Sequence, residues 1–178
     1  SALPAVVLLS ACASLGRSVF ATPVVELRDI RMKAIGFQGG SMDIILSSYG
    51  DNLGVRAYRN VNNASSWASC STGLPTNGHY LDVCSADFDS DGYKDLVFGR
   101  VAGNALRCFY GNGTGSWSEN STGLCATDAY VGVDAADFNG DGAVDFAAAS
   151  YSSTGIFCYR NLHFAPPQPV LNLTAPLG

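Results

Sequence analysis

The chain of 178 residues has little charge, two histidines and none of the short motifs that mark common catalytic sites. Charged residues are 14% of the total and the net charge is −5, which argues against a nucleic-acid partner because phosphate binding needs a basic face. Neither His79 nor His163 stands in a catalytic pattern, and no HExxH, G-x-S-x-G or Walker sequence occurs. We therefore expect that the protein is not an enzyme.

No stretch has the 3.6-residue periodicity of an amphipathic helix, and no transmembrane segment is expected. Hydrophobic residues, 47% of the chain, fall instead in short runs rich in Val, Ile, Leu, Phe and Tyr. These runs end at Gly, Asn, Ser or Asp, and glycines are spread along the chain as many tight turns require. The sequence therefore predicts an all-β fold.

No two cysteines form a CxxC pair, which argues against a zinc ribbon or a thioredoxin-like site. An even number of widely spaced cysteines is typical of disulfides in an oxidising compartment. The alternative is that they are buried free thiols. The sequence does not choose among the pairings, and the candidates are Cys12, Cys70, Cys84, Cys108, Cys125 and Cys158.

A repeat with an offset of 50 residues runs through the chain. Residues 80–99 read YLDVCSADFDSDGYKDLVFG, and residues 130–149 read YVGVDAADFNGDGAVDFAAA. A decayed copy over residues 34–60 has the same layout, with Phe37 where the others have Phe88 and Phe138, but it lacks the acidic side chains at Gly36, Gln38 and Gly40 and is one residue shorter before Asp43. A fixed period of this length indicates a stack of similar units.

The first residues admit two interpretations. The string ALPAVVLLSAC resembles the apolar core of a secretion signal, and LSAC resembles a lipoprotein cleavage box. However, VVLLS at 6–10 matches IILSS at 44–48. We therefore interpret the segment as half of a repeat. Residues 1–162 then hold about three and a half repeats: 1–21 (half), 22–79 (degenerate), 80–129 and 130–162 (each with an acidic loop), followed by a Pro-rich linker or edge strand at 163–178.

The acidic residues concentrate in two nine-residue loops, D-F-D-S-D-G-Y-K-D at 87–95 and D-F-N-G-D-G-A-V-D at 137–145. Oxygen-bearing side chains stand at positions 1, 3, 5 and 9, and a glycine at position 6 permits a sharp turn. Calcium prefers roughly six to eight oxygen ligands, whereas magnesium keeps its waters. Two bound calcium ions would change the net charge from −5 to −5 + 4 = −1. The alternative is an Asp-Gly turn without a metal.

An EF-hand begins in the same way but needs a glutamate at position 12 and flanking helices. Position 12 is Phe98 in one loop and Ala148 in the other, and strand-like sequence follows both. The loops, the trailing DLVFG and DFAAA segments and the 50-residue period instead resemble the FG-GAP or VCBS repeats of integrin-α-type β-propellers.

This resemblance implies an all-β fold of propeller-type blades of antiparallel strands, in which a calcium loop joins the first two strands of a blade. The implied ligands are Asp87, Asp89, Asp91, Tyr93 (carbonyl) and Asp95 in the first loop, and Asp137, Asn139, Asp141, Ala143 (carbonyl) and Asp145 in the second. Three and a half repeats cannot close the usual ring. The alternatives are a longer chain, a ring completed by a second chain, or an open filament.

Two further features bear on partners. The N-x-S/T sequons at Asn63, Asn112, Asn120 and Asn172 are glycosylation candidates, or else ordinary turn-forming asparagines. Trp67 and Trp117 recur with the repeat, which favours packing over sugar stacking.

Our first hypothesis is an extracellular, calcium-stabilised structural or adhesion module that binds other proteins or copies of itself. The alternatives are a glycan-binding lectin and an accessory domain of a secreted enzyme.

Overall fold

The computed structural model describes residues 30–36, 42–50, 52–61, 63–102, 105–151, 155–162 and 168–173. These residues form twelve strands and no helix, so the all-β prediction is confirmed. Among them, no helix that could cross a membrane is found. The half repeat expected over residues 1–21 and Cys12 within it lie outside the described residues.

The strands are grouped into three sheets of four. The first sheet contains β1 (Ile30–Ile35), β2 (Asp43–Ser48), β3 (Val55–Val61) and β4 (Ser66–Ser69). The second contains β5 (His79–Ala86), β6 (Asp95–Ala102), β7 (Ala105–Gly111) and β8 (Trp117–Glu119). The third contains β9 (Tyr130–Ala136), β10 (Asp145–Ser150), β11 (Ile156–Arg160) and β12 (Gln168–Leu173).

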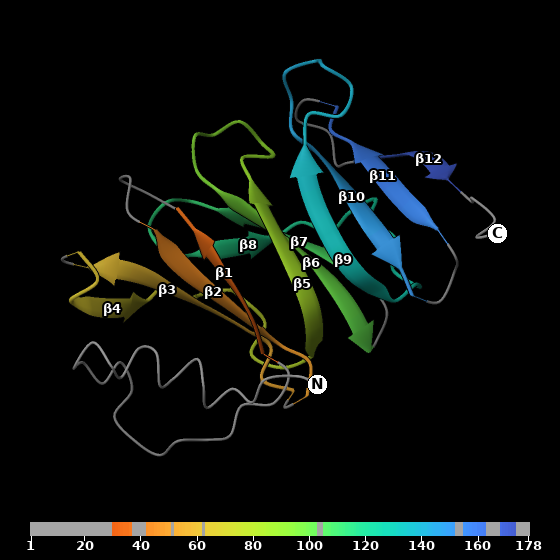
Figure 1. Cartoon of the computed structure of the whole chain (residues 1–178). Coiled ribbons are helices and arrows are strands. Elements are labelled where there is room, and N and C mark those ends of the chain that lie inside the picture. Colours follow the sequence, from red (N-terminus) through yellow and green to blue (C-terminus); the bar gives the residue numbers. More distant parts are fainter. Residues whose placement is uncertain are drawn as a thin grey trace.

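Each sheet is an antiparallel meander in which strand order equals chain order, as in a propeller blade. Figure 1 shows the three sheets one after another, without closure into a ring. Strand β12 forms the edge of the third sheet by pairing with β11, and it contains Pro169, a residue that sheets accommodate on edge strands. The acidic loops are the connections from the first to the second strand of the second and third sheets.

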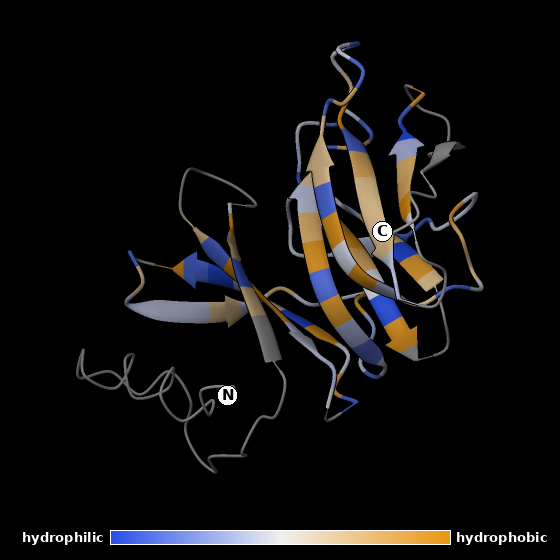
Figure 2. Ribbon diagram, turned by 45° about the vertical axis from the view of Figure 1, so that its right-hand side comes forward, coloured by the Kyte–Doolittle hydropathy of each residue, from blue (hydrophilic) through white to orange (hydrophobic). Residues whose placement is uncertain are grey.

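Alternate side chains of each strand point toward the preceding or the following sheet, as the two-residue period of a strand requires. We call the surface of a sheet that points toward the sheet before it in the chain its preceding face, and the surface that points toward the sheet after it its following face. In β6, Leu96 and Phe98 lie in the cluster shared with the first sheet, whereas Val97 lies in the cluster shared with the third. The alternating hydrophobic and hydrophilic bands along the strands are visible in Figure 2.

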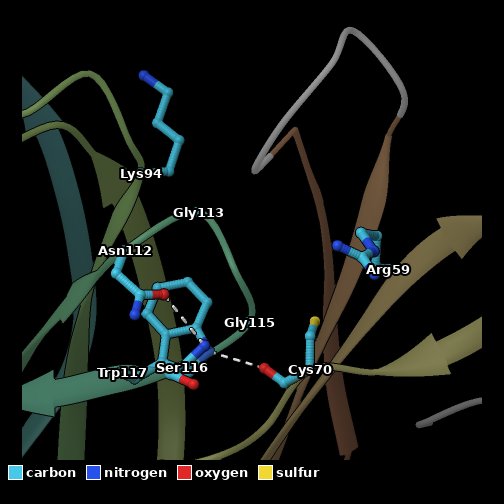
Figure 3. A pocket seen from close by; sticks show the side chains of 9 residues that line it. Arg59, Cys70, Lys94, Asn112, Gly113, Gly115, Ser116 and Trp117 are labelled. Carbon is cyan, nitrogen blue, oxygen red and sulfur yellow. Dashed lines mark hydrogen bonds between the residues drawn. The ribbon is translucent and has the colours of Figure 1, made fainter.

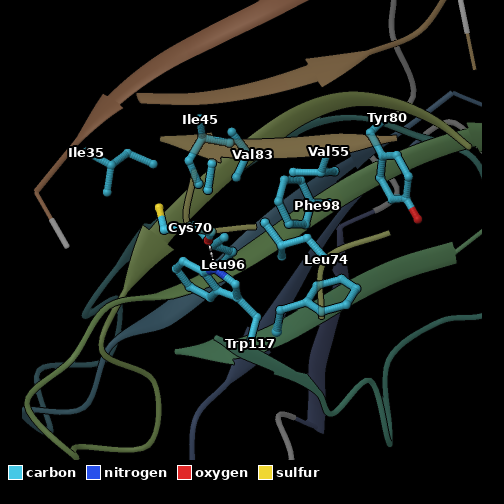
Figure 4. Close-up of a cluster of buried hydrophobic side chains, with 12 residues drawn as sticks. Ile35, Ile45, Val55, Cys70, Leu74, Tyr80, Val83, Leu96, Phe98 and Trp117 are labelled. Atoms are coloured by element: carbon cyan, nitrogen blue, oxygen red, sulfur yellow. Dashed lines mark hydrogen bonds between the residues drawn. The ribbon is translucent and has the colours of Figure 1, made fainter. Parts of the chain in front are cut away.

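The first core lies between the first and second sheets (Figure 4). Phe98 is fully buried at its centre and makes edge-to-face contacts with Tyr80 and Phe109 at centroid distances of 5.6 and 5.9 Å. Such pairs add about 0.5–1.5 kcal/mol to the stabilisation from burial alone. The members are Ile35, Ile45, Val55, Ala57, Cys70 and Leu74 from the first sheet and its exit turn, and Tyr80, Val83, Leu96, Phe98, Phe109 and Trp117 from the second.

The second core repeats this construction between the second and third sheets. Phe146 stacks on Tyr159 at 4.6 Å and meets Phe88 edge-to-face at 5.9 Å. The following face of the second sheet contributes Cys84, Ala86, Phe88, Val97, Leu106, Cys108 and Leu124, and the preceding face of the third contributes Tyr130, Val133, Phe146, Ala148 and Tyr159. Neighbouring sheets are therefore held together by apolar side chains at equivalent positions.

The described cysteines are all free thiols, so the disulfides expected from the sequence are not seen among Cys70, Cys84, Cys108, Cys125 and Cys158. Cys84 and Cys108 pair with Val97 from opposite sides, which puts their Cα atoms two strand spacings, roughly 10 Å, apart. A disulfide needs less than about 7 Å. Burial raises the pKa of Cys84 to about 12 and that of Cys70 to about 11, so both stay protonated.

Candidate metal centre

Both acidic loops close a hairpin between the first two strands of their sheets. Asp95 pairs with Ala86 at the start of β6, and Asp145 pairs with Ala136 at the start of β10. The last acid of each loop is therefore also the first residue of a strand, and the other loop residues project beyond the end of the sheet.

In the first loop, the acidic side chains turn inward onto the loop's own backbone. The two carboxylate oxygens of Asp87 accept hydrogen bonds from the N–H groups of Asp91 (3.1 Å) and Gly92 (3.0 Å). Asp89 also accepts from Asp91 N–H, at 3.2 Å. Ser90 and Gly92 have positive φ angles of 61° and 89°, which bend the backbone around these carboxylates.

The second loop has the same internal hydrogen bonds. Asp137 accepts from the N–H groups of Asp141 (3.2 Å) and Gly142 (2.9 Å), and Asn139 accepts from Asp141 N–H at 2.8 Å. Asp137 also accepts from Gly140 N–H at 2.7 Å. These backbone donors, led by Gly142, lower the pKa of Asp137 below its ordinary value. The turn therefore forms with the same hydrogen bonds whether position 3 is an aspartate, as in the first loop, or an asparagine, as in the second.

The acid at position 9 is buried and holds the loop and the third strand together. Asp95 is 0% exposed, and its two oxygens accept from Phe88 N–H (2.7 Å) and Gly111 N–H (2.9 Å). Asp145 accepts in the same way from Phe138 N–H (3.1 Å) and Asn161 N–H (2.7 Å). Each of these acids therefore has a structural role in addition to any role in metal binding.

Three acids of the first loop come together. Oxygens of Asp87, Asp89 and Asp95 lie within 4.8 Å of one another, close enough to share one cation. Burial raises the pKa of Asp95 to about 7, and the nearby negative charges of Asp89 and Asp91 add to the rise. Burial also raises the pKa of Asp89. A bound divalent cation would reverse this repulsion, so the donor set fits a hard ion such as calcium.

The remaining expected ligands occupy the same loops but are not part of this convergence. Asp91 and Asp141 each accept from the N–H two residues on, that of Tyr93 at 2.8 Å and that of Ala143 at 2.9 Å. Within the described residues, a group of three acids is found in the first loop and not in the second, where Asn139 replaces one acid. The second loop thus has the same internal hydrogen bonds but one fewer carboxylate, and therefore less negative charge.

Sequence reasoning missed the structural role of position 9, although a signal was present. The decayed loop of the first sheet keeps Asp43, which is 0% exposed and accepts from Asn60 N–H at 2.8 Å. The amide of Asn60 donates to Met42 O (3.2 Å), as that of Asn161 donates to Val144 O (3.3 Å). The retention of this one aspartate where the other acids are lost indicates a function beyond metal binding.

One hydrogen bond ties the first loop to the next sheet. The Asn161 amide at the end of β11 donates to the carbonyl oxygen of Phe88 at 2.6 Å. The Phe88 ring is 3% exposed in the second core, whereas the equivalent Phe138 is 54% exposed. The first loop is therefore supported by the following sheet, and the second loop has no such support from the described residues.

Trp117 lies beside a pit at the joint of the first and second sheets (Figure 3). The indole is 7% exposed and donates to Cys70 O at 2.8 Å. The pit measures about 20 Å³, room for roughly one water. This geometry supports the packing interpretation of Trp117, since a sugar ring needs an open indole face. Trp67 is half-buried in β4.

The sequons differ in exposure. Asn63 and Asn112 are exposed in turns, whereas Asn120 is half-buried. The side-chain oxygen of Asn112 accepts from the Thr114 hydroxyl at 2.7 Å, within its own sequon. Asn172 lies in the edge strand β12.

Comparison with known families gives one result. The model of the FG-GAP-like repeat matches residues 40–98 and 87–148. Together the matches span residues 40–148, which is 109 of 178 residues and more than half of the chain. The second match begins at Asp87 and extends just beyond the second loop, so each unit runs from one loop to the next. No curated protein matches the chain.

Proposed function

Because the chain belongs to the FG-GAP-like repeat family, we propose that it is an extracellular structural or adhesion module whose loops bind calcium. The supporting observation is the convergence of Asp87, Asp89 and Asp95 within 4.8 Å in the first loop. The second loop has the same hydrogen bonds and supplies a second, less acidic site. Calcium holds the first strand of a sheet to the second by neutralising carboxylates that otherwise repel each other.

The extracellular part of the proposal rests on chemistry that suits that compartment. A calcium loop with few charged ligands binds the ion weakly, so it is filled where the calcium concentration is high, as it is outside cells. Exposed sequons at Asn63 and Asn112 are in turns that a glycosylating enzyme would reach. The proposed role is non-catalytic, because neither histidine stands in a catalytic pattern of the sequence.

Calcium titration tests the metal sites. Isothermal calorimetry on chelator-treated protein should show two calcium ions bound per chain, with magnesium much weaker. At a calcium concentration about 100 times Kd, each site stabilises the fold by about 2.7 kcal/mol. For a chain of this size that corresponds to roughly 5–11 °C in Tm, which EGTA should remove.

Matched variants separate metal binding from a general effect of charge. Asp91→Ala and Asp141→Ala should each remove part of the stabilisation by calcium. Asp134→Asn, which removes an exposed charge on β9 outside the loops, should bind two ions like the unaltered chain. An identical melt with calcium and with EGTA would count decisively against the proposal.

The two alternative functions have distinct readouts. Binding to a glycan array that is lost in Trp117→Ala would support the lectin, although the buried indole gives no reason to expect it. Covalent continuity with a catalytic domain would support the accessory role. Neither outcome alters the calcium sites.

A further inference from the structure

The two acidic loops belong to neighbouring sheets, and one residue, Asn161, contacts both of them. Asn161 follows β11 and is 3% exposed. Its amide donates to the carbonyl oxygen of Phe88 in the first loop at 2.6 Å, and its main-chain N–H donates to a carboxylate oxygen of Asp145 in the second loop at 2.7 Å. The amide also donates to Val144 O in the second loop at 3.3 Å. A single buried residue therefore joins the two loops.

In the first loop this contact falls among the expected calcium ligands. The carbonyl that Asn161 binds belongs to the peptide bond between Phe88 and Asp89. The N–H of Phe88 donates to Asp95 at 2.7 Å, and Asp87 precedes Phe88 in the chain. Asp87, Asp89 and Asp95 are the three acids that converge within 4.8 Å. A displacement of Phe88 would therefore disturb the convergence of all three acids.

In the second loop the contact falls on the acid at position 9. Asp145 is 3% exposed, and its other carboxylate oxygen accepts from Phe138 N–H at 3.1 Å. Phe146, the next residue, meets the ring of Phe88 edge-to-face at 5.9 Å. The hydrogen bonds of Asn161 to Phe88 and Asp145 are buried, so their loss would leave polar groups that water cannot satisfy. Asp145 is therefore held by a residue that also holds the first loop.

The joint between the first and second sheets provides an internal comparison. There the buried indole of Trp117 donates to Cys70 O at 2.8 Å, but Cys70 follows β4 and lies outside the acidic loops. At the position of Asn161 the second sheet has Gly111, whose N–H likewise donates to Asp95. A Cβ at Gly111 would lie 2.3 Å from Lys94 O, which leaves no room for an amide. Within the described residues, a loop-to-loop bridge thus occurs at the joint where both loops keep their acids.

We propose that Asn161 is a positioning residue that couples the two calcium sites, so that an ion in either loop strengthens binding in the other. The inference rests on the proposed calcium loops and adds a regulation to them. When the three acids of the first loop are drawn together, Phe88 is fixed. Its fixed carbonyl holds the Asn161 amide, and the main chain of Asn161 orients Asp145. Ordering completed in one loop is then not repeated in the other, and such coupling is reciprocal.

The sign of the coupling separates this route from direct electrostatics. Two divalent cations repel each other, so an effect of charge alone would make the second ion bind more weakly. It would also persist without the Asn161 amide. Coupling through Asn161 instead strengthens the second binding step and depends on that amide.

The glycines at position 6 allow each loop to be followed separately. Gly92 N–H donates to Asp87 at 3.0 Å, and Gly142 N–H donates to Asp137 at 2.9 Å. In a calcium titration of the full chain, the two amide signals in ¹⁵N–¹H NMR spectra give two midpoints, one for each loop.

Emptying one loop then measures its effect on the other. Asp137→Asn/Asp141→Asn keeps side-chain oxygens that accept the hydrogen bonds of the turn but removes two charges from the second loop. The midpoint at Gly92 should then rise about tenfold. Asp87→Asn/Asp91→Asn should raise the midpoint at Gly142 by the same factor, because coupling between two binding sites is reciprocal.

Variants of Asn161 test the route. Asn161→Ala and Asn161→Gly both remove the amide and keep the main-chain N–H that Asp145 accepts. In either background, emptying the second loop should leave the midpoint at Gly92 unchanged. A merely structural role would weaken both sites and keep their dependence on each other. Asn60→Ala removes the equivalent amide of the first sheet, which donates to Met42 O beside the decayed loop, and should keep the tenfold response.

Two results would overturn the inference and leave the calcium sites in place. One is a midpoint at Gly92 that ignores the second loop in the chain with Asn161 intact, a comparison that needs no variant of Asn161 to fold. The other is a coupling that persists in both Asn161 variants. Glycine signals that do not respond to calcium at all would instead overturn the proposed function, and this inference with it.

Discussion

The loops at 87–95 and 137–145 share a motif and a hydrogen-bond pattern but lie in different surroundings. The first has four acids, a buried Phe88 and a carbonyl held by Asn161 of the next sheet. The second has three acids and Asn139, and its Phe138 is exposed. A repeated sequence thus produces the same turn twice, whereas the stability of that turn depends on which sheet follows it.

Truncation of the two phenylalanines should give the largest contrast. Phe88→Ala empties a site within the second core and should lower the free energy of unfolding by about 3–5 kcal/mol. Phe138→Ala should change it by less than about 0.5 kcal/mol in the monomer, because the ring is already in solvent. Urea denaturation in calcium measures both, and equal losses would contradict the difference in surroundings.

The decayed loop can separate structure from metal binding. Asp95→Ala leaves two buried N–H groups without an acceptor, and Asp43→Ala leaves the partly buried N–H of Asn60 without one, so each should cost about 1–3 kcal/mol in EGTA. Adding calcium should increase the difference in the free energy of unfolding between Asp95→Ala and the unaltered chain. The corresponding difference for Asp43→Ala should stay the same. A calcium-dependent loss in Asp43→Ala would show that the decayed loop still binds the ion.

Exchanging position 3 between the loops should exchange their affinities. Asp89→Asn gives the first loop the ligand set of the second, and Asn139→Asp does the reverse. One added or removed carboxylate should change Kd about tenfold, near 1.4 kcal/mol, because the site is partly screened by solvent. Calorimetry with each variant provides the test, and unchanged affinities would mean that charge does not distinguish the loops.

Position 4 should give the smallest effect. Ser90 has φ 61° where the second loop has Gly140 at φ 76°. Ser90→Gly relieves a left-handed serine but increases the entropy of the unfolded chain, so a net stabilisation of about 0.5 kcal/mol is expected. Gly140→Ser should destabilise by a similar amount, since open space surrounds Gly140 and only its φ resists a side chain. Thermal melts check both, and a lower Tm for Ser90→Gly or a higher Tm for Gly140→Ser would refute the argument.

Much of the site was predictable because it is local. The spacing of Asp87, Asp89 and Asp91 within a few residues determines which backbone N–H groups they meet, and the structure shows these bonds. The second function of Asp95 was not predictable in this way. Its acceptor role depends on Gly111 in another strand, 16 residues away, which becomes a neighbour only when the sheet forms.

The sequence alone determined the strands, the turns and the repeat, because alternating side chains and Asp-Gly loops act over a few residues. Tertiary structure decided what the same residues do at each repeat: Phe88 is buried and Phe138 exposed, and the described cysteines are free thiols. The physical reason is that burial is a property of a pair of faces. A repeat unit specifies only one half of each joint, and the neighbouring sheet supplies the other.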